Sequence, residues 1–268
     1  MNNLDLNKIS RGIKLKVLEI AVSKGKGHLG GTFSCLDLLV ALYYDNNLRI
    51  DPQNALWEDR DRFILSKGHA CIALYIILED LGFISADQLA SYGDDGGLGA
   101  QIDTSLNGVD WNTGSLGHAL GVASGMAMAS KINNKNFFAC AMLGDAEMSE
   151  GSVWEAICYA GDKKINNLIC IVDRNKLSVT EILDDDGIFR NFQSTLKNLG
   201  WNPIEINGHN FNEISTAFQN AKASEKPTMI LANTVKGKGV SFMENNLKWH
   251  HGVPSAAELE MARFELSI

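Results

Sequence analysis

The chain has 268 residues and a net charge of −8, with 45% hydrophobic and 21% charged residues, which is an ordinary composition for a globular protein. Its acidic residues are spread along the sequence, and this argues against a nucleic-acid-binding protein, which needs clustered lysine and arginine. No apolar run reaches the roughly 20 residues of a membrane helix, the N-terminus is polar, and the five cysteines form no Cys-x-x-Cys pair, so we expect a reduced, cytoplasmic protein with no membrane segment.

The first element expected is a helix over residues 7–24, because Ile9, Ile13 and Val17 recur at the spacing of one helical face. The glycine cluster at 25–31 is expected to end it. In chain order, the predicted helices span residues 7–24, 33–45, 69–81, 117–132, 150–163, 188–199, 211–223 and 255–266, and the predicted strands span 62–65, 137–143, 168–172 and 228–233.

The predicted strands are short, rich in Ile, Val, Phe and Leu, and bounded by Gly, Asp or Asn, as expected for strands that are buried on both faces. Their alternation with helices predicts an α/β fold, a mostly parallel sheet with helices on both faces. The length fits a single domain over residues 1–268. Ligands of such sheets bind at the carboxyl ends of the strands.

Polar residues follow two of the predicted strands at these ends. Asp145 comes after the strand 137–143, and Asn175 and Leu177 come after the strand 168–172. A carboxylate, an amide oxygen and a backbone carbonyl are hard ligands of the kind that Mg²⁺ shares with substrate phosphates. Taken singly, each is also an ordinary turn residue after a strand. Together, at this spacing, they predict a magnesium and diphosphate site.

Five motifs in the same order along the chain resemble those of the transketolase family. They are Lys26-Gly-His-Leu-Gly30, the segment 59–70 that ends in Ser-Lys-Gly-His-Ala, Thr113-Gly-Ser-Leu-Gly117, the segment 144–156 that begins Gly-Asp-Ala-Glu, and the segment 234–240 followed by Trp249-His250. The resemblance covers nearly the whole chain. It implies the diphosphate-type domain of these enzymes, which binds thiamine diphosphate and Mg²⁺.

The resemblance also implies a role for each matching residue. Mg²⁺ would be held by Asp145, Asn175 and the Leu177 carbonyl, and the cofactor would be contacted by His69, Gly114, Ser115, Leu116, Asp145, Ala146, Glu155, Asn175 and Lys236. Glu150 matches an acid at the subunit interface. His28 and His250 match the catalytic histidines, whose ordinary pKa near neutrality suits the proton transfers of ketol chemistry. His251 leaves open which of the adjacent pair faces the site, and His209 is interpreted as a solvated or capping side chain.

Three positions depart from the family pattern. Ala146 stands where glycine is usual, and His118 stands where glutamine is usual. Ala100 is predicted to occupy the position of a histidine, in a Gly-His-Pro motif, that contacts the donor's hydroxyl groups. Loss of such a contact costs about 1–3 kcal/mol when a hydroxyl is left unpaired. We therefore expect an altered donor or acceptor.

The family's pyrimidine-binding domain, which supplies the glutamate that activates the cofactor, has no counterpart in this sequence. The resemblance therefore predicts the N-terminal subunit of a split transketolase. This subunit would transfer a two-carbon ketol unit from a ketose or ketose phosphate to an aldose. Its partner would be a C-terminal subunit with the pyrimidine-binding domain, in a dimer of heterodimers (a heterotetramer). Two alternatives remain open: a deoxyxylulose-phosphate-synthase-like transferase that uses a 2-oxo acid and forms an acyloin, and a non-catalytic binding subunit.

Overall fold

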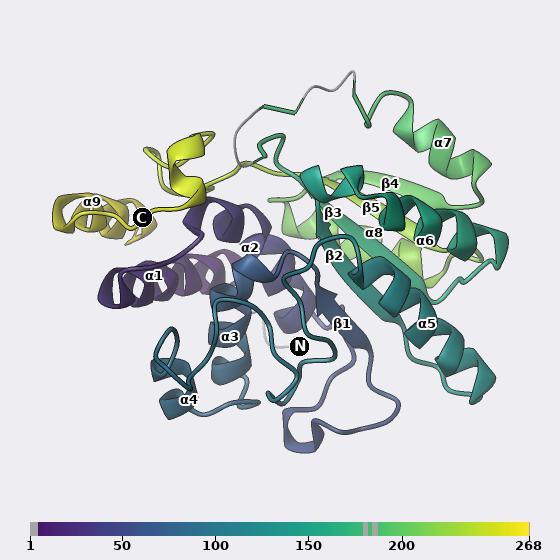
Figure 1. Ribbon diagram of the computed structural model, residues 1–268, viewed down its shortest axis with the longest axis horizontal. Coiled ribbons are helices and arrows are strands. Elements are labelled where there is room, and N and C mark those ends of the chain that lie inside the picture. The colour runs from purple at the N-terminus through teal and green to yellow at the C-terminus, as the bar shows by residue number, and fades with distance from the viewer. Residues whose placement is uncertain (1–4, 179–181, 184–186, 268) are drawn as a thin grey trace.

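The computed structural model describes residues 5–178, 182–183 and 187–267. Its centre is a five-stranded, wholly parallel sheet in the order β1-β2-β3-β5-β4 (Figure 1). The strands are β1 Arg62–Leu65, β2 Ala139–Gly144, β3 Leu168–Arg174, β4 Asn202–Asn207 and β5 Thr228–Asn233. The predicted α/β fold class is confirmed, and so are the four strands predicted from their apolar runs.

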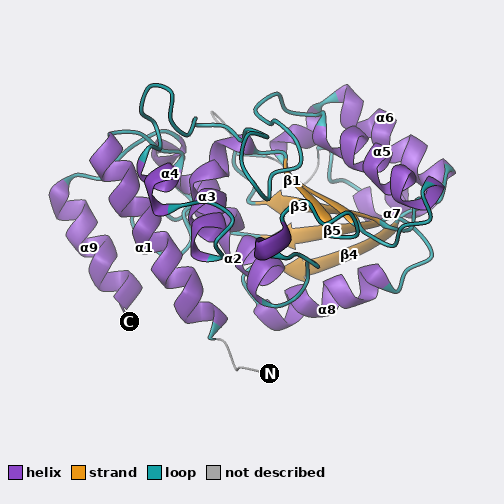
Figure 2. Ribbon diagram, turned by 90° about the horizontal axis from the view of Figure 1, so that it is seen from below, coloured by secondary structure: helices purple, strands orange, loops and turns teal. Residues whose placement is uncertain are grey.

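Helices cover both faces of the sheet because successive strand residues point to opposite sides. In β3, Ile169 and Ile171 face one core, whereas Leu168, Cys170 and Val172 face the other. The first core is closed by α1 Leu6–Lys24, α2 Leu29–Tyr44, α3 Cys71–Asp80, α4 Ala86–Ala90, α8 Phe211–Lys222 and α9 Ala256–Ser267, and the second by α5 Ala119–Ile132, α6 Gly151–Asp162 and α7 Phe192–Asn198. In Figure 2, α5 and α6 lie on one side of the strands and α8 on the other.

Two elements were not predicted from the sequence. The strand β4 has only one buried residue, Ile206, and contains Pro203. Both features suit its place at the edge of the sheet, where proline costs no ladder hydrogen bond, and they hide it from a search for apolar runs. The short helix α4 is set by a capping box at Ser85 and Gln88. No helix in the described part of the chain is long and apolar enough to cross a membrane.

The helix α2 begins at Leu29, four residues earlier than predicted, because two glycines of the cluster lie inside its first turn. A Cβ atom on Gly30 would come within 2.9 Å of the Trp249 carbonyl oxygen, and one on Gly31 within 3.0 Å of His69 Nε2. Glycine is needed here for close approach rather than to end a helix. The end of α1 falls at Gly25, whose φ of 65° is left-handed.

Candidate active site

The tips of β2 and β3 lie side by side. Gly144 pairs with Asp173 in the parallel register, and the Asp145 amide donates to the Asp173 carbonyl at 3.2 Å. The next residues, Asp145 and Asn175, are 3% and 6% exposed. Asp145 Oδ2 accepts a hydrogen bond from the Lys176 amide at 2.5 Å, and Asn175 Oδ1 accepts one from the Leu177 amide at 3.1 Å. The fold therefore brings together the oxygen ligands that the sequence placed at two strand ends.

A cavity of about 140 Å³ opens at these tips. Among its lining residues are eight of the predicted site residues, namely His69, Leu116, Asp145, Ala146, Asn175, Leu177, Lys236 and His250. Gly114 and Ser115 lie beside it in the same loop as Leu116, exposed at its edge. A Cβ atom on Gly144 would meet nothing within 4 Å, so the backbone at the end of β2 is open to a ligand.

Lys236 supplies a buried cation to this cavity. The residue is 2% exposed, and its ammonium donates to the carbonyl oxygens of Leu177 and Ser178 at 3.1 and 2.8 Å. Within the described ranges no carboxylate forms an ion pair with it. Burial, then the charge of Lys67, lowers the pKa of Lys236 to about 8. A buried ammonium without a counter-ion is costly, and an anionic ligand would supply one.

Four histidines gather at the mouth of the cavity. The His28 ring lies 5.4 Å from that of His69, 5.8 Å from that of His250 and 4.3 Å from that of His251. His250 Nδ1 is also 3.1 Å from the Lys236 ammonium. Both members of the adjacent pair therefore reach the cluster, His250 on the cavity side and His251 against His28.

The histidines are not poised at neutral pH as the sequence suggested. Burial, then the neighbouring His251, lowers the pKa of His28 to about 4. Burial, then Lys236, lowers the pKa of His250 to about 4, and burial, then Lys67, lowers that of His69 to about 2. Each ring is therefore neutral near pH 7, with one donor and one acceptor nitrogen. Such rings suit hydrogen bonding to substrate hydroxyl groups.

The donor set fits a magnesium-bound diphosphate. The part of the chain that the structure describes has no cluster of three or more His, Cys, Asp or Glu side chains that could hold a metal alone. Asp145, Asn175 and the Leu177 carbonyl form instead a partial set of hard oxygen ligands, of the kind that phosphate oxygens complete around Mg²⁺. Burial, then the charge of Asp173, raises the pKa of Asp145 to about 6, a shift that a bound cation would reverse.

The sequence profile described as "Transketolase, thiamine diphosphate binding domain" matches residues 7–267. The chain belongs to the transketolase family. It is 38% identical over 254 residues to an apulose-4-phosphate transketolase subunit of Phocaeicola vulgatus, covering 94% of this chain and 90% of that one. It is 36% identical over 251 residues to the 6-deoxy-6-sulfo-D-fructose transketolase subunit SqwG of a Clostridium species, covering 92% and 91% of the two chains.

Solved transketolase structures share the fold. The enzyme of Leishmania mexicana superposes with a TM-score of 0.91 at 25% identity over 98% of this chain, and that of Campylobacter jejuni with 0.90 at 28% over 99%. The chain spans 41% and 43% of those two longer proteins. The predicted resemblance is thus confirmed, as is a transketolase-type transferase subunit with a thiamine-diphosphate-binding domain. The 2-oxo-acid alternative is not favoured.

A buried ion pair behind the cavity at the tips of β2 and β3 was not predicted from the sequence. The Lys67 ammonium pairs with Asp173 and donates to the Gly31 carbonyl at 2.8 Å. Burial would raise the pKa of Asp173, but Lys67 and the hydroxyls of Ser34 and Thr234 hold it below its ordinary value. Lys67 lies in the Ser-Lys-Gly-His motif, and Asp173 lies two residues before the predicted ligand Asn175. Their position beside predicted site residues is the sequence signal that could have identified them.

Glu147 was also missed, although it lies in the Gly-Asp-Ala-Glu motif. The residue is 2% exposed, and it accepts hydrogen bonds from the Ser66 hydroxyl, from the Gly117 amide at 2.8 Å and from the Gly144 amide at 3.2 Å. One buried carboxylate therefore ties together three of the loops that resemble the family. We assign it a positioning role.

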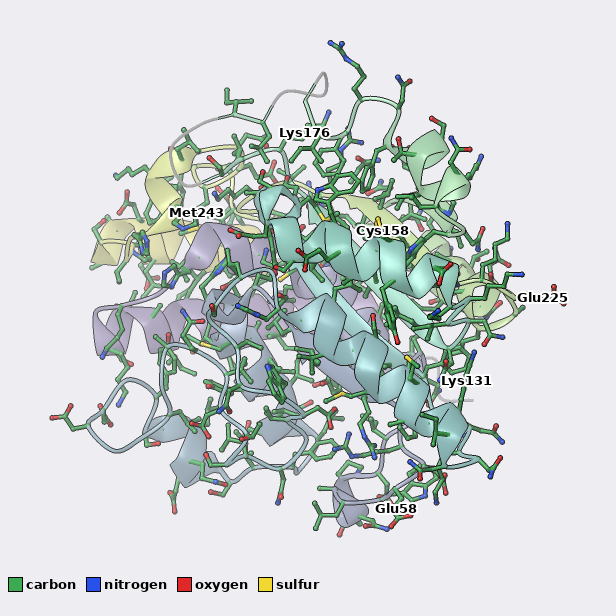
Figure 3. All side chains as sticks on the ribbon, turned by 45° about the vertical axis from the view of Figure 1, so that its right-hand side comes forward. Glu58, Lys131, Cys158, Lys176, Glu225 and Met243 are labelled. Atoms are coloured by element: carbon green, nitrogen blue, oxygen red, sulfur yellow. The ribbon has the colours of Figure 1, made fainter. Side chains whose placement is uncertain are left out.

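Glu155 does not line the cavity. It lies on the exposed side of α6, in a groove between α5 and α6 that His118 also lines. Figure 3 shows these two helices side by side on the outer surface, with Cys158 on α6 and Lys131 at the end of α5. Glu150 stands at the start of α6, where a Cβ atom on Gly117 would lie 2.8 Å from its Cβ. The contacts predicted for Glu155 and Glu150 therefore concern a surface other than the cavity.

The position predicted to replace the family's donor-contacting histidine is better matched by Gln101 than by Ala100. Ala100 and Gln101 are both exposed and line a separate cavity of about 530 Å³. The Gln101 side chain lies against the loops that carry the motifs, since a Cβ atom on Gly68 would meet its Oε1 at 2.5 Å and one on Gly114 its Cγ at 3.1 Å. The Tyr75 hydroxyl fixes its backbone by donating to its carbonyl at 2.6 Å.

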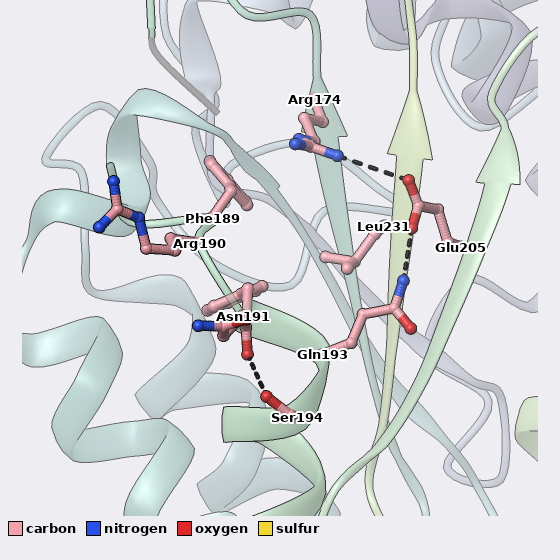
Figure 4. Close-up of a pocket in the computed structure, with 9 residues that line it drawn as sticks. Arg174, Phe189, Arg190, Asn191, Gln193, Ser194, Glu205 and Leu231 are labelled. Atoms are coloured by element: carbon pink, nitrogen blue, oxygen red, sulfur yellow. Dashed lines mark hydrogen bonds and ion pairs between the residues drawn. The ribbon is translucent and has the colours of Figure 1, made fainter. Parts of the chain in front are cut away.

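Another cavity, of about 560 Å³, lies beside the N-terminus of α7 and contains none of the predicted site residues (Figure 4). Its charged groups interact with one another. Arg174 is 3.4 Å from the Glu205 carboxylate and 4.8 Å from the centre of the Phe189 ring, and Gln193 donates to Glu205. Because Arg174, Glu205 and Gln193 already interact with one another or with neighbouring side chains, this cavity is a weaker candidate than the one at the tips of β2 and β3.

Proposed function

We propose that the chain is the N-terminal, diphosphate-binding subunit of a two-chain transketolase. The enzyme moves a two-carbon ketol unit from a ketose or ketose phosphate to an aldose. Two relatives, of which this chain covers 90% and 91%, are themselves named as transketolase subunits, and this supports a division of the enzyme between chains. In this proposal residues 1–268 form a single domain.

One observation carries the proposal. At the tips of β2 and β3, three oxygen ligands suited to Mg²⁺ share a cavity with the buried ammonium of Lys236, which forms no carboxylate ion pair within the described ranges. A magnesium-bound diphosphate offers a cation to the first group and an anion to the second. Thiamine diphosphate, when bound, would supply the nucleophilic carbon and the electron sink of ketol transfer.

The chain's own residues would then bind and orient. Asp145, Asn175 and the Leu177 carbonyl would hold Mg²⁺. Cofactor contacts would come from His69, Gly114, Ser115, Leu116, Asp145, Ala146, Asn175 and Lys236, whereas Glu155, which was also predicted as a contact, lies outside the cavity. His28 and His250, neutral at pH 7 through burial, would hold the substrate hydroxyls and exchange their protons. Gln101, with one donor and one acceptor group, would complement a further hydroxyl.

The partner in this proposal is a C-terminal transketolase subunit with the pyrimidine-binding domain, in a dimer of heterodimers. The outer face of α5 and α6 supports such an assembly. Gly121 and Gly125 leave it open, because a Cβ atom on either would meet nothing within 4 Å, and Glu155 lies on this face rather than in the cavity.

The test is reconstitution with a C-terminal transketolase subunit, followed by assays with ketose phosphates, unphosphorylated ketoses and pyruvate as donors. The proposal expects ketol transfer that needs both chains, thiamine diphosphate and Mg²⁺. Transfer by this chain alone would contradict the two-chain assignment, and use of pyruvate but no ketose would contradict the reaction class. A reconstituted complex that binds thiamine diphosphate without turnover would favour the non-catalytic subunit.

A further inference from the structure

His209, interpreted from the sequence as a solvated or capping side chain, is held at both ring nitrogens. Its Nε2 lies 2.9 Å from the backbone nitrogen of Val235, and its Nδ1 lies 2.7 Å from Asp37 Oδ2. A backbone amide can only donate, so Nε2 is the acceptor and Nδ1 carries the hydrogen that Asp37 accepts. With a side chain that is 12% exposed, His209 is a fixed link between Asp37 and the segment that follows β5.

The Asp37 side chain is itself held in place by further hydrogen bonds. It lies in α2, 6% exposed, and also accepts hydrogen bonds from the Ser10 hydroxyl and from the Lys14 ammonium at 3.0 Å. One turn earlier in α2, Ser34 donates to Asp173 behind the cavity at 2.6 Å. The carboxylate that holds His209 thus belongs to a helix that is itself attached to the site.

The other end of the link is the residue before Lys236. The segment 234–240 contacts the first turn of α2, where the Gly237 amide donates to the Gly30 carbonyl at 3.0 Å. Between Thr234, which bonds to Asp173, and Gly237, the amide of Val235 is held by His209. This bond therefore lies one residue before Lys236, whose ammonium donates to the Leu177 carbonyl.

We propose that His209 is a positioning residue for cofactor binding: the Asp37–His209–Val235 link holds the Lys236 backbone so that its ammonium faces the diphosphate site. The inference rests on the proposed function. It predicts that the acceptor at Nε2 governs cofactor affinity, whereas the donor at Nδ1 contributes mainly to the stability of the fold. The two ring nitrogens can be tested separately, because asparagine and glutamine place their amide groups near Nδ1 and Nε2 respectively.

The experiment titrates thiamine diphosphate, with Mg²⁺ present, into the full chain assembled with its partner subunit, and measures the dissociation constant by calorimetry. His209→Asn keeps a donor for Asp37 but does not reach Val235, so its affinity is expected to fall about tenfold, the effect of one lost hydrogen bond. His209→Gln keeps an acceptor for Val235 and is expected to stay within about threefold of wild type. The matched control Glu213→Gln, in the first turn of α8 and bonded to Asn207 and Asn210, should leave affinity unchanged.

A double-mutant cycle of His209→Asn with Lys236→Met separates a positioning role from general destabilisation of the fold. If His209 acts through Lys236, His209→Asn has little further effect in the Lys236→Met background. An equal loss in both backgrounds, or wild-type affinity in His209→Asn, overturns the inference. If His209→Asn does not fold, His209→Gln carries the test, and a loss as large as that of Lys236→Met overturns the inference. A wild-type assembly that binds no thiamine diphosphate contradicts the proposed function as well.

Discussion

Two regions of the molecule differ in the charge that they carry, namely the cavity at the tips of β2 and β3 and the outer face of α5 and α6. The cavity buries charge: Lys67, Asp145, Glu147, Asp173 and Lys236 are each at most 3% exposed. The outer face carries little charge. Glycines recur on it, and Glu155, Cys158 and Tyr159 are exposed there.

This difference in charge indicates what kind of ligand or partner each region can bind. In the cavity, almost every buried charge has a partner within the chain, and the ammonium of Lys236, without a carboxylate ion pair in the described ranges, calls for an anion. On the outer face, the charged residue Glu155 is exposed and needs no ligand to neutralise it. The small residues there leave room for another protein surface to pack against the two helices. The first region is built to bind a cofactor, and the second is suited to contact another chain.

The largest effect is expected from breaking the charge pairing of the cavity. Lys67→Met leaves Asp173 buried without its partner, which should reduce the free energy of unfolding by about 3–5 kcal/mol. Urea unfolding measures it. Lys135→Met, which removes the exposed pairs with Glu58 and Asp59, serves as the control and should change the free energy of unfolding much less. If both variants lose similar amounts of unfolding free energy, the buried Lys67–Asp173 pair stabilises the fold no more than an exposed pair does.

A second effect should fall on ligand binding rather than on folding. Asp145→Asn keeps the shape of the side chain but removes the charge that Mg²⁺ needs, so Mg²⁺-dependent binding of thiamine diphosphate should weaken by about 100-fold. Calorimetry with and without Mg²⁺ checks this. Asp162→Asn, at an exposed position at the end of α6, is the matched control. Unchanged binding in Asp145→Asn would remove it from the proposed metal site.

The sequence predicted the buried parts of the fold well and the exposed parts poorly. Apolar runs identified four strands because both of their faces are buried, and the parallel sheet followed from their alternation with helices. The edge strand β4 has one buried residue and a proline, so no periodic signal marks it. The first turn of α2 was missed because Gly30 and Gly31 are read as breakers, whereas the fold uses them for close approach to Trp249 and His69.

Only those residues of the candidate site that belong to local sequence motifs could be predicted. Asp145, Asn175 and Leu177 follow strands, so their meeting at one sheet edge could be foreseen. The roles of Lys67 and Glu147 depend on partners 106 and 81 residues away along the chain, and that of His209 on Asp37 172 residues away. Such long-range contacts leave no spacing signal. The neutral state of the histidines was missed for the same reason, because it results from burial by distant segments.

A smaller effect should test the outer face of α5 and α6. Gly125 is exposed, and a Cβ atom there meets nothing within 4 Å, so Gly125→Leu should leave the isolated chain as stable or raise stability by up to about 1 kcal/mol. If the partner subunit packs on this face, association should weaken by about tenfold, measurable by analytical ultracentrifugation. Asn220→Leu, on the exposed side of α8, is the control. Equal association in both variants would place the partner elsewhere.

The smallest effect concerns the protonation of Lys236. Because its pKa lies at about 8 and an anionic ligand binds the protonated form, the affinity for thiamine diphosphate should be constant below this pKa. It should decline as pH rises through it, by about fourfold between about pH 7 and about pH 8.5. Calorimetric titrations across this range check the sign. Lys236→Met should abolish the decline, whereas Lys238→Met, which removes a lysine paired with Glu244, should retain it. A decline that persists in Lys236→Met belongs to another group, and diphosphate binding would then not depend on the protonation of Lys236.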